Sequence, residues 1–328
     1  MSKSNKMNNP INSKENESRL SHITNSIRES YEKHGGIKHL EEPCLPSKKE
    51  VGKLVKLLST IMFPGFYEEA TGDKNHLEGY LLAQCSNALE CLSDLIQKSL
   101  RHECKDGIDC FRTEGECWDR AVEITYLLLE NIPEIREVMN IDIKAAYDGD
   151  PAATSYYEVV LSYPSVRAIL VYRLAHFLEL QKVPYIPRMM SEFIHEKTGI
   201  DIHPGAEIGP GFFIDHGTGV VIGCTSVLGK NIKFYQHVTL GALSLSNVDK
   251  IRKAKKKRHP TVEDDVTIYA GSTILGGKTV IQKGSVIGGN VWLTRSVPPY
   301  TTVTFDSPYL IFKQKDKKAE KYVIDYQI

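Results

Sequence analysis

The chain has 328 residues, of which 41% are hydrophobic and 25% charged, an ordinary composition for a soluble protein of about two domains. Lysine plus arginine and aspartate plus glutamate number 41 each, so no net charge favours nucleic acid or an anionic membrane as a partner. The apolar stretches are too short to cross a bilayer, and residues 1–20 lack the apolar segment of a secretory signal.

Cysteine usage favours a reducing compartment. The seven cysteines are an odd number without a Cys-x-x-Cys pair, which argues against a disulfide framework and for a cytoplasmic location. Cys104, Cys110 and Cys117 lie near one another in the sequence, but only His102 accompanies them at a ligand-like spacing. We therefore expect no metal site there.

Apolar side chains recur at helical spacing through the N-terminal part of the chain, for example over residues 166–178. Prolines such as Pro133 and Pro164 are expected to mark the ends of helices. The pattern predicts an all-helical domain of about seven helices over residues 21–200. A polar and disordered tail is expected at residues 1–20.

A different period begins near residue 201. The positions that recur every six residues are Ile202, Ile208, Ile214, Val220, Ser226, Ile232 and Val238, then Val262, Ile268, Ile274, Val280, Val286 and Trp292. Neither a helix nor an alternating strand gives this period, whereas a short strand followed by a tight glycine-containing corner does. Three such units close a triangular coil, and stacked coils bury an apolar column. An irregular glycine-rich β domain is the alternative, and so many positions in phase argue against it.

This pattern resembles the hexapeptide-repeat proteins, whose fold is a left-handed parallel β-helix. The resemblance covers roughly residues 201–303 and implies the left hand, which the period alone does not give; the β-helix domain is predicted at residues 201–305. The predicted fold class is therefore α+β: an N-terminal all-helical domain, a left-handed β-helix and a C-terminal tail at residues 306–328.

Residues 244–260 interrupt the repeat and are predicted to leave the coil as a loop. The loop is rich in lysine and arginine, which could indicate a nucleic-acid patch or a solvated loop. The neutral chain and the lack of interleaved aromatic residues argue against nucleic acid. A basic loop on a β-helix also suits the phosphates of coenzyme A, for which Lys255, Lys256 and Lys257 are the candidates.

Two polar segments depart from what a structural coil needs. Asp201 and His216 lie 15 residues apart, close to one coil of about 18 residues, so they are expected to meet across adjacent coils. A neutral imidazole is a suitable base near pH 7, and a carboxylate on its other nitrogen fixes its orientation. A hydroxyl group that acts as acyl acceptor needs such a base. An ordinary surface hydrogen bond is the alternative interpretation of the pair.

Several motifs together resemble the serine O-acetyltransferase family. They are Asp150-Pro151-Ala152, Tyr172-Arg173-Leu174-Ala175-His176, Asp201-Ile202-His203-Pro204, Asp215-His216-Gly217-Thr218-Gly219, Val238-Thr239-Leu240-Gly241 and Arg258-His259-Pro260. They occur in family order between about residues 150 and 299, which is more specific than a hexapeptide repeat.

The resemblance implies transfer of an acetyl group from acetyl-coenzyme A, as co-substrate, to the hydroxyl of L-serine, with no metal. It implies that His216 is the base and that Asp201 pairs with it. It also implies that Asp150 and Asp215 contact serine and that Arg258 holds the serine carboxylate.

In the family the site lies between subunits, so the resemblance implies that His259 completes it from a neighbouring chain. The implied assembly is a homotrimer or a dimer of trimers joined through the helical domains. L-Cysteine is the implied feedback inhibitor.

The donor side of the site departs from the family pattern. A backbone N–H of Gly241 or Ala242 is our candidate for binding the oxyanion. The family commonly has Leu-Gly-Gly-Thr-Gly-Lys where this chain has residues 240–245, and a Gly-x-Pro-Ala segment is replaced at residues 305–309. Contacts to coenzyme A are therefore less well defined by the resemblance than contacts to serine.

Three rival functions are considered. A hexapeptide O-acetyltransferase for a sugar or antibiotic would keep His216 but has no reason for Asp150 and Arg258 together. A carbonic anhydrase needs three metal-binding histidines, and the coil contains no His-x4-His pair. A scaffold that only binds a partner enzyme would not need the polar residues of the site, which are Asp201, Asp215, His216, Arg258 and His259.

The end of the chain carries a separate signal. Residues 313–321 are almost wholly charged and are expected to be exposed and mobile, but the last residues are apolar and aromatic. In the resembling family a terminal isoleucine inserts into O-acetylserine sulfhydrylase. The resemblance therefore implies that Ile328 binds that partner, through carboxylate capture and side-chain burial.

Overall fold

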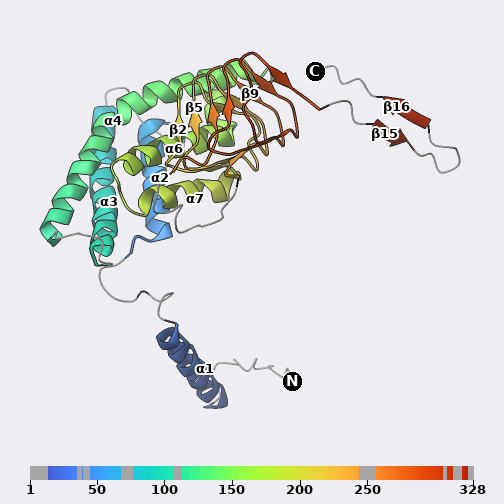
Figure 1. Cartoon of the computed structure of the whole chain (residues 1–328). Helices are drawn as coiled ribbons and strands as arrows, with labels where there is room; N and C mark the ends of the chain where they lie inside the picture. The colour runs from blue at the N-terminus through green and yellow to red at the C-terminus, as the bar shows by residue number, and fades with distance from the viewer. Residues whose placement is uncertain are drawn as a thin grey trace, which may run out of the picture. The chain divides into compact units, whose positions relative to one another are not determined.

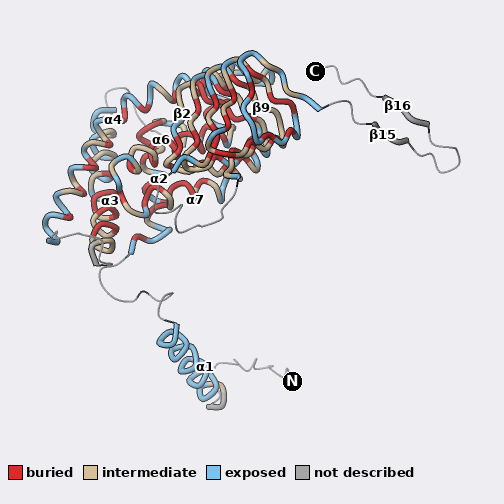
Figure 2. The backbone as a smooth tube through the Cα atoms, in the orientation of Figure 1, coloured by how far each residue is buried: buried red, intermediate tan, exposed pale blue. Residues whose placement is uncertain are grey.

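The computed structural model describes residues 14–34, 39, 45–67, 77–105, 113–243, 256–305, 309–312 and 320–323. The chain divides into two units, Met1–Leu45 and Pro46–Ile328. The first unit contains helix α1 (Lys14–Lys33), which begins inside the stretch predicted to be a polar tail. Its described side chains are almost all exposed (Figure 2).

Six helices form the first part of the second unit (Figure 1). They are α2 (Lys48–Met62), α3 (Leu77–Lys105), α4 (Glu114–Gly149), α5 (Tyr156–Ser162), α6 (Pro164–Leu180) and α7 (Ile186–Thr198). Capping boxes start α2 at Ser47 and α4 at Thr113. Seven helices are thus described in all, as predicted. Within the described residues, every helix is too short or too polar to span a bilayer.

Proline predicts one helix boundary correctly and another wrongly. Pro164 is the first residue of α6, where its missing N–H costs nothing. Pro133 lies inside the 36-residue α4, although the sequence predicts a helix end there. Ile132 and Ile135 on either side are both buried in the core, so packing of the long helix offsets the lost hydrogen bond. Cys117, in the first turn of α4, is likewise a buried core residue.

The second part is a parallel β-helix, as predicted. Its strands are β1 (Asp201–Ile202), β2 (Glu207–Ile208), β3 (Phe213–Ile214), β4 (Val221–Ile222), β5 (Val227–Leu228), β6 (Lys233–Phe234), β7 (Thr239–Gly241), β8 (Thr261–Val262), β9 (Thr267–Ile268), β10 (Thr273–Leu275), β11 (Val280–Ile281), β12 (Val286–Ile287), β13 (Trp292–Leu293) and β14 (Thr302–Val303). They form three parallel sheets in the orders β1-β4-β7-β10-β13, β11-β8-β5-β2 and β14-β12-β9-β6-β3. Most strands therefore pair with the strand three places further along the chain, which closes one triangular coil (Figure 1).

The predicted six-residue phase is confirmed in the first coils and wrong in the last. Ile202, Ile214 and Ile268 are buried inside the coil as expected. Trp292, by contrast, is 66% exposed, and Leu293 takes the inward place. The phase shifts after β10, where Gly276 adopts a φ of 102° in a corner with one extra residue.

The first coil is longer than the repeat predicts. Asp201 pairs with Val221, which makes this coil 20 residues long, whereas Val221 pairs with Thr239 at the usual spacing of 18. The extra length falls between β3 and β4, at residues 215–219. This corner carries the Asp-His-Gly-Thr-Gly segment.

A buried ion pair joins the helical part to the β-helix. Asp142 of α4 is 3% exposed and binds Arg173 of α6 through two hydrogen bonds of 2.7 and 3.0 Å. Oδ1 of Asp142 also accepts the N–H groups of Gly211 and Phe212, each at 2.9 Å. Arg173 also donates to the carbonyl of Gly209. Every charge in this pair is satisfied, so the end of α4 is held against the first coils.

The predicted tail contains two strands, β15 (Tyr309–Phe312) and β16 (Glu320–Val323), paired antiparallel. Residue Ile328 lies outside the described residues.

Candidate active site

His216 lies at the corner between β3 and β4. Its backbone is in the left-handed region, with a φ of 60°, and its side chain is 73% exposed. Gly217 follows with a φ of 84°, and a Cβ on it would lie 2.5 Å from Ile200, so only glycine fits beneath this corner. The strained corner therefore presents the imidazole outward, open to solvent.

The Asp215 carboxylate lies beside His216. One of its oxygens, Oδ1, is 3.7 Å from Nε2 of His216, and the other, Oδ2, is 3.7 Å from Nζ of Lys233. Asp215 thus faces one titratable base and one permanent cation. The sequence predicted Asp215 as a site residue but gave no signal for Lys233.

Asp150 approaches the same corner from the end of α4. As the C-cap residue it receives hydrogen bonds from the hydroxyl of Tyr163 and, at 2.9 Å, from the N–H of Ala152. These two bonds, the first being stronger, lower the pKa of Asp150, and the charges of Lys233 and His216 lower it further. Asp150 is therefore ionised and oriented before any substrate arrives.

We name Asp150, Tyr163, Asp215, His216 and Lys233 the His216 cluster. Tyr163 was also missed by the sequence analysis. Burial raises the pKa of Tyr163, and its bond to Asp150 raises it further, so the hydroxyl keeps its proton and donates it.

Asp201 lies in a different environment from the one predicted by the 15-residue spacing. The residue beside it in the next coil is Val221, which is five residues beyond His216. Its carboxylate lies 3.5 Å from Arg188 of α7, and within the described part of the chain the ion pair of Asp201 is with Arg188 rather than with His216.

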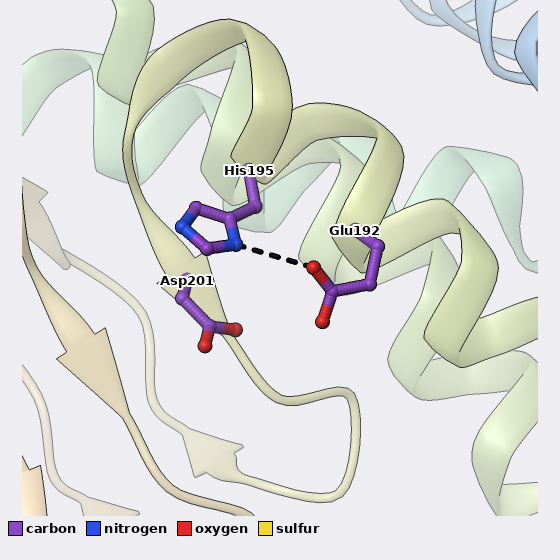
Figure 3. A group of neighbouring side chains, drawn as sticks. All are labelled: Glu192, His195 and Asp201. Carbon is purple, nitrogen blue, oxygen red and sulfur yellow. Dashed lines mark hydrogen bonds and ion pairs between the residues drawn. The ribbon is translucent and has the colours of Figure 1, made fainter.

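Glu192 and His195 of α7 complete the surroundings of Asp201 (Figure 3). Nδ1 of His195 is 3.2 Å from Glu192, and the three side chains have the spacing of metal ligands. Arg188, however, contacts the carboxylates of both Glu192 and Asp201. The positive charge that these acids attract is thus supplied by the protein itself.

A second polar cluster surrounds His259, just before β8. Nδ1 of His259 accepts the N–H of Thr225 at 3.1 Å, and the Thr225 hydroxyl oxygen accepts the N–H groups of Arg258 at 2.9 Å and of His259 at 3.0 Å. The guanidinium of Arg258 lies 3.1 Å from the sulfur of Cys224, and Nζ of Lys257 donates to the carbonyl of Thr225 at 2.9 Å. We name this set the His259 cluster, and Thr225 is its centre.

The electrostatics of the His259 cluster keep its histidine neutral. Burial first, and then the charges of Arg258 and Lys257, lower the pKa of His259 to about 4. Because Nδ1 accepts a backbone N–H, the ring proton belongs on Nε2. His259 is therefore a neutral hydrogen-bond donor through Nε2 at physiological pH.

His203 repeats this arrangement nearby. Its Nδ1 accepts the N–H of Gly205 at 2.9 Å, and burial, followed by the charges of Arg188 and Arg258, lowers its pKa to about 4. His203 belongs to a motif that the sequence analysis quoted, but it was not among the predicted site residues.

The two clusters occupy different corners of the β-helix. His216 precedes β4, whereas Thr225, which binds His259, follows it. His216 and Thr225 are nine positions apart along the chain, with β4 between them. Within one protomer the two clusters are therefore separate groups of residues.

The predicted donor-side residues are only partly described. Gly241 ends β7, and its carbonyl accepts the N–H of Gly276 at 3.0 Å. A Cβ on Gly241 would lie 2.8 Å from Leu275, so the strands pack closely here. Ala242 follows it at a half-buried position, and Lys256 is exposed. Lys255 lies outside the described residues.

One cavity of about 480 Å³ is lined by Arg188, Glu192 and His195 on α7, together with Lys48 of α2. His216 itself lies on an exposed corner of the β-helix.

Comparisons with known proteins agree with these motifs. No family model matches the chain. It is 42% identical over 257 residues to a plasmid-encoded serine acetyltransferase of Synechococcus elongatus, covering 77% of this chain and 80% of that protein. Serine acetyltransferase isoform 3 of Entamoeba histolytica, solved in complex with cysteine, superposes with a TM-score of 0.67 at 32% identity, covering 91% of this chain and 96% of that one.

Serine acetyltransferase 1 of the same organism, in complex with L-cysteine, gives a TM-score of 0.66 at 33% identity, covering 88% of this chain and all of that one (100%). The predicted helical part and β-helix thus both have counterparts in solved enzymes. With this degree of identity and coverage, the chain belongs to the serine acetyltransferase family.

Proposed function

We propose that the chain transfers the acetyl group of acetyl-coenzyme A to the hydroxyl of L-serine, with His216 as the general base. The observation that carries the proposal is the corner at His216. It presents an exposed imidazole 3.7 Å from the carboxylate of Asp215 and within the electrostatic influence of Asp150, and Gly217 adopts a positive φ where a side chain would clash. Membership of the family supplies the reaction class.

In the proposed step His216 takes the proton of the serine hydroxyl while the oxygen attacks the thioester carbon. The C–O bond forms, the carbonyl becomes an oxyanion, and the oxyanion then collapses and expels the coenzyme A sulfur. The imidazolium returns the proton to that sulfur, so the products are O-acetyl-L-serine and free thiol. A backbone N–H of Gly241 or Ala242 is proposed to stabilise the oxyanion.

Asp201 is proposed to orient the His216 imidazole. Since Asp201 pairs with Arg188 in the structure, this role requires its carboxylate to exchange Arg188 for the imidazole. Asp215, which already lies 3.7 Å from the ring, is proposed to face the serine ammonium together with Asp150.

The remaining serine contacts are proposed to come from the His259 cluster of a neighbouring protomer. Arg258 would bind the serine carboxylate, and the Nε2–H of His259 would donate to the substrate. The separation of the two clusters within one protomer supports a shared site, and hence a homotrimer or a dimer of trimers.

Two further partners follow from this proposal. L-Cysteine differs from L-serine only in having a thiol for a hydroxyl, and two solved relatives bind it, so we propose it as a competitive feedback inhibitor. The basic residues Lys255, Lys256 and Lys257 are proposed to bind the phosphates of coenzyme A.

The product is proposed to serve cysteine biosynthesis in the cytoplasm, with Ile328 binding O-acetylserine sulfhydrylase. Titration of that enzyme with a peptide ending in residues 325–328 tests the contact. The same peptide without Ile328 should not bind, and binding of both peptides with equal affinity would refute the role of Ile328.

The reaction itself is tested by thiol release from acetyl-coenzyme A with L-serine, compared with a panel of sugars. The proposal expects release with L-serine only. Release with a sugar but not with L-serine would favour the rival sugar O-acetyltransferase. Mass spectrometry of the acetylated product distinguishes transfer from simple hydrolysis of the thioester.

A further inference from the structure

Lys233 is the one permanent cation described in the His216 cluster, and it lies on a strand rather than on the basic loop. It is the first residue of β6 and precedes the buried Phe234, so its side chain points out of the coil. Its Nζ donates to the carbonyl of Gly149 at 2.7 Å and lies 3.7 Å from Oδ2 of Asp215.

The carbonyl that Lys233 binds is the end of a helix. Gly149 is the last residue of α4, and α4 has no basic residue of its own in its last turn. A cation at this end is favourable because the terminal carbonyls carry partial negative charge. Lys233 therefore supplies, from the β-helix, the charge that the helix end lacks, and so connects α4 to β6.

The Lys233 side chain is held in place by several contacts. Its ammonium lies 5.2 Å from the ring centre of Phe213 and 4.6 Å from that of Tyr235. A Cβ on Gly149 would lie 2.9 Å from the Phe213 ring, so the helix end and this ring are already in close contact. The side chain is only 22% exposed, unlike a mobile surface lysine.

We propose that Lys233 is a positioning residue of the acceptor site. Lys233 holds Asp150 and Asp215 around His216, and its positive charge contributes to the electrostatic environment of the His216 ring. This inference rests on the proposed function of His216 as base. Asp215 presents one oxygen to Lys233 and the other to His216, so the lysine and the imidazole share one carboxylate.

Several titratable groups determine the electrostatic environment of His216. The acidic groups are Asp150 at the end of α4, Glu158 of α5 and Asp215, and the basic groups are His216 itself and Lys233. Tyr163 keeps its proton and is therefore neutral. Removing Lys233 takes away a positive charge that opposes protonation of His216. It also removes the competing cation from Asp215, whose carboxylate then interacts with the imidazolium alone. Both effects favour the charged imidazolium over the neutral ring.

The test compares Lys233→Met, which keeps the aliphatic stem, with Lys233→Arg, which keeps the charge. Lys283→Met is the matched control, because Lys283 lies 3.4 Å from Asp265 elsewhere on the β-helix. Two readouts are used: the acid limb of kcat/KM against pH with L-serine, and NMR titration of the His216 ring in histidine-labelled protein, identified by its loss in His216→Ala.

For Lys233→Met we expect the acid limb and the NMR midpoint to move up by about 0.5 to 1 pH unit. Lys233→Arg and Lys283→Met should leave both in place. An unchanged midpoint in a folded Lys233→Met protein overturns the inference, as does an equal shift in Lys283→Met. The NMR titration needs no turnover, so inactivity of the unaltered protein toward L-serine would refute the proposed function separately.

Discussion

Thr225 fixes the proton position of His259, because its backbone N–H binds Nδ1 of the ring and its hydroxyl oxygen accepts two N–H groups of the adjoining chain. The histidine that we propose to contact substrate in a neighbouring protomer is thus oriented within its own protomer. Thr225, which belongs to no recognised motif, is the centre of this arrangement.

Replacing Thr225 by valine keeps the shape of the side chain but leaves the N–H groups of Arg258 and His259 without their acceptor. We expect the free energy of unfolding, measured by urea denaturation, to fall by about 1–3 kcal/mol, the cost of unpaired buried donors. Thr225→Ser, which keeps the oxygen, should lose much less. Equal losses in both variants would show that the methyl packing, and not the hydroxyl, matters.

Asp150→Ala and Arg258→Ala test the serine contacts. Each removes one charge-assisted hydrogen bond to substrate, so KM for L-serine should rise by about tenfold or more while KM for acetyl-coenzyme A changes little. Steady-state kinetics with each substrate varied separately gives both values.

Replacing Lys255, Lys256 and Lys257 together serves as the reciprocal control for those variants. This triple replacement should weaken only the binding of acetyl-coenzyme A, and the loss of affinity should be larger at low salt. A rise in the KM for the donor alone in Asp150→Ala would place Asp150 on the wrong side of the site.

The two aspartates near His216 are predicted to differ in role. Asp201→Asn should lower kcat with little change in the KM for L-serine, and by less than His216→Ala, since orientation is lost but the base remains. Asp215→Asn should chiefly raise the KM for L-serine. If Asp215→Asn lowers kcat and Asp201→Asn does not, the orienting carboxylate is Asp215, as the 3.7 Å distance to His216 allows.

Stability should depend on pH through His203 and His259. Both have a folded pKa of about 4, below the ordinary histidine value of 6.5, so between these pH values the unfolded chain binds more protons than the folded one. Stability from these groups is therefore full above about pH 6.5 and is lost as the pH falls toward 4. Thermal unfolding from pH 7 to 4.5 should show a shallower decline in His203→Gln/His259→Gln than in the unaltered chain, and parallel curves would contradict this.

The architecture could be predicted from the sequence because the helical period and the six-residue period both depend on residues that are close together in the chain. Buried residues such as Ile202 and Ile214 recur at multiples of six residues and so indicate the coil, and Pro164 marks the start of α6. The period could not show that residues 215–219 lengthen the first coil or that a corner near Gly276 shifts the phase, so Trp292 was wrongly placed inside.

The site was only partly predictable for a related reason. Asp150, Asp215, His216, Arg258 and His259 were named through motifs, and the structure distributes them over two corners. Lys233, Tyr163 and Thr225 have no such signal, because each acts on a residue that only the fold brings close. Lys233 and Gly149, for instance, are 84 positions apart in the sequence.

The role of His216 as the base for acetyl transfer to serine is tested by His216→Ala. The measurement is the rate of O-acetyl-L-serine formation at saturating L-serine and acetyl-coenzyme A, with circular dichroism and thermal unfolding to confirm the fold. We expect a folded variant whose kcat is lower by about a hundredfold or more. A folded variant that forms O-acetyl-L-serine at nearly the original rate would contradict it.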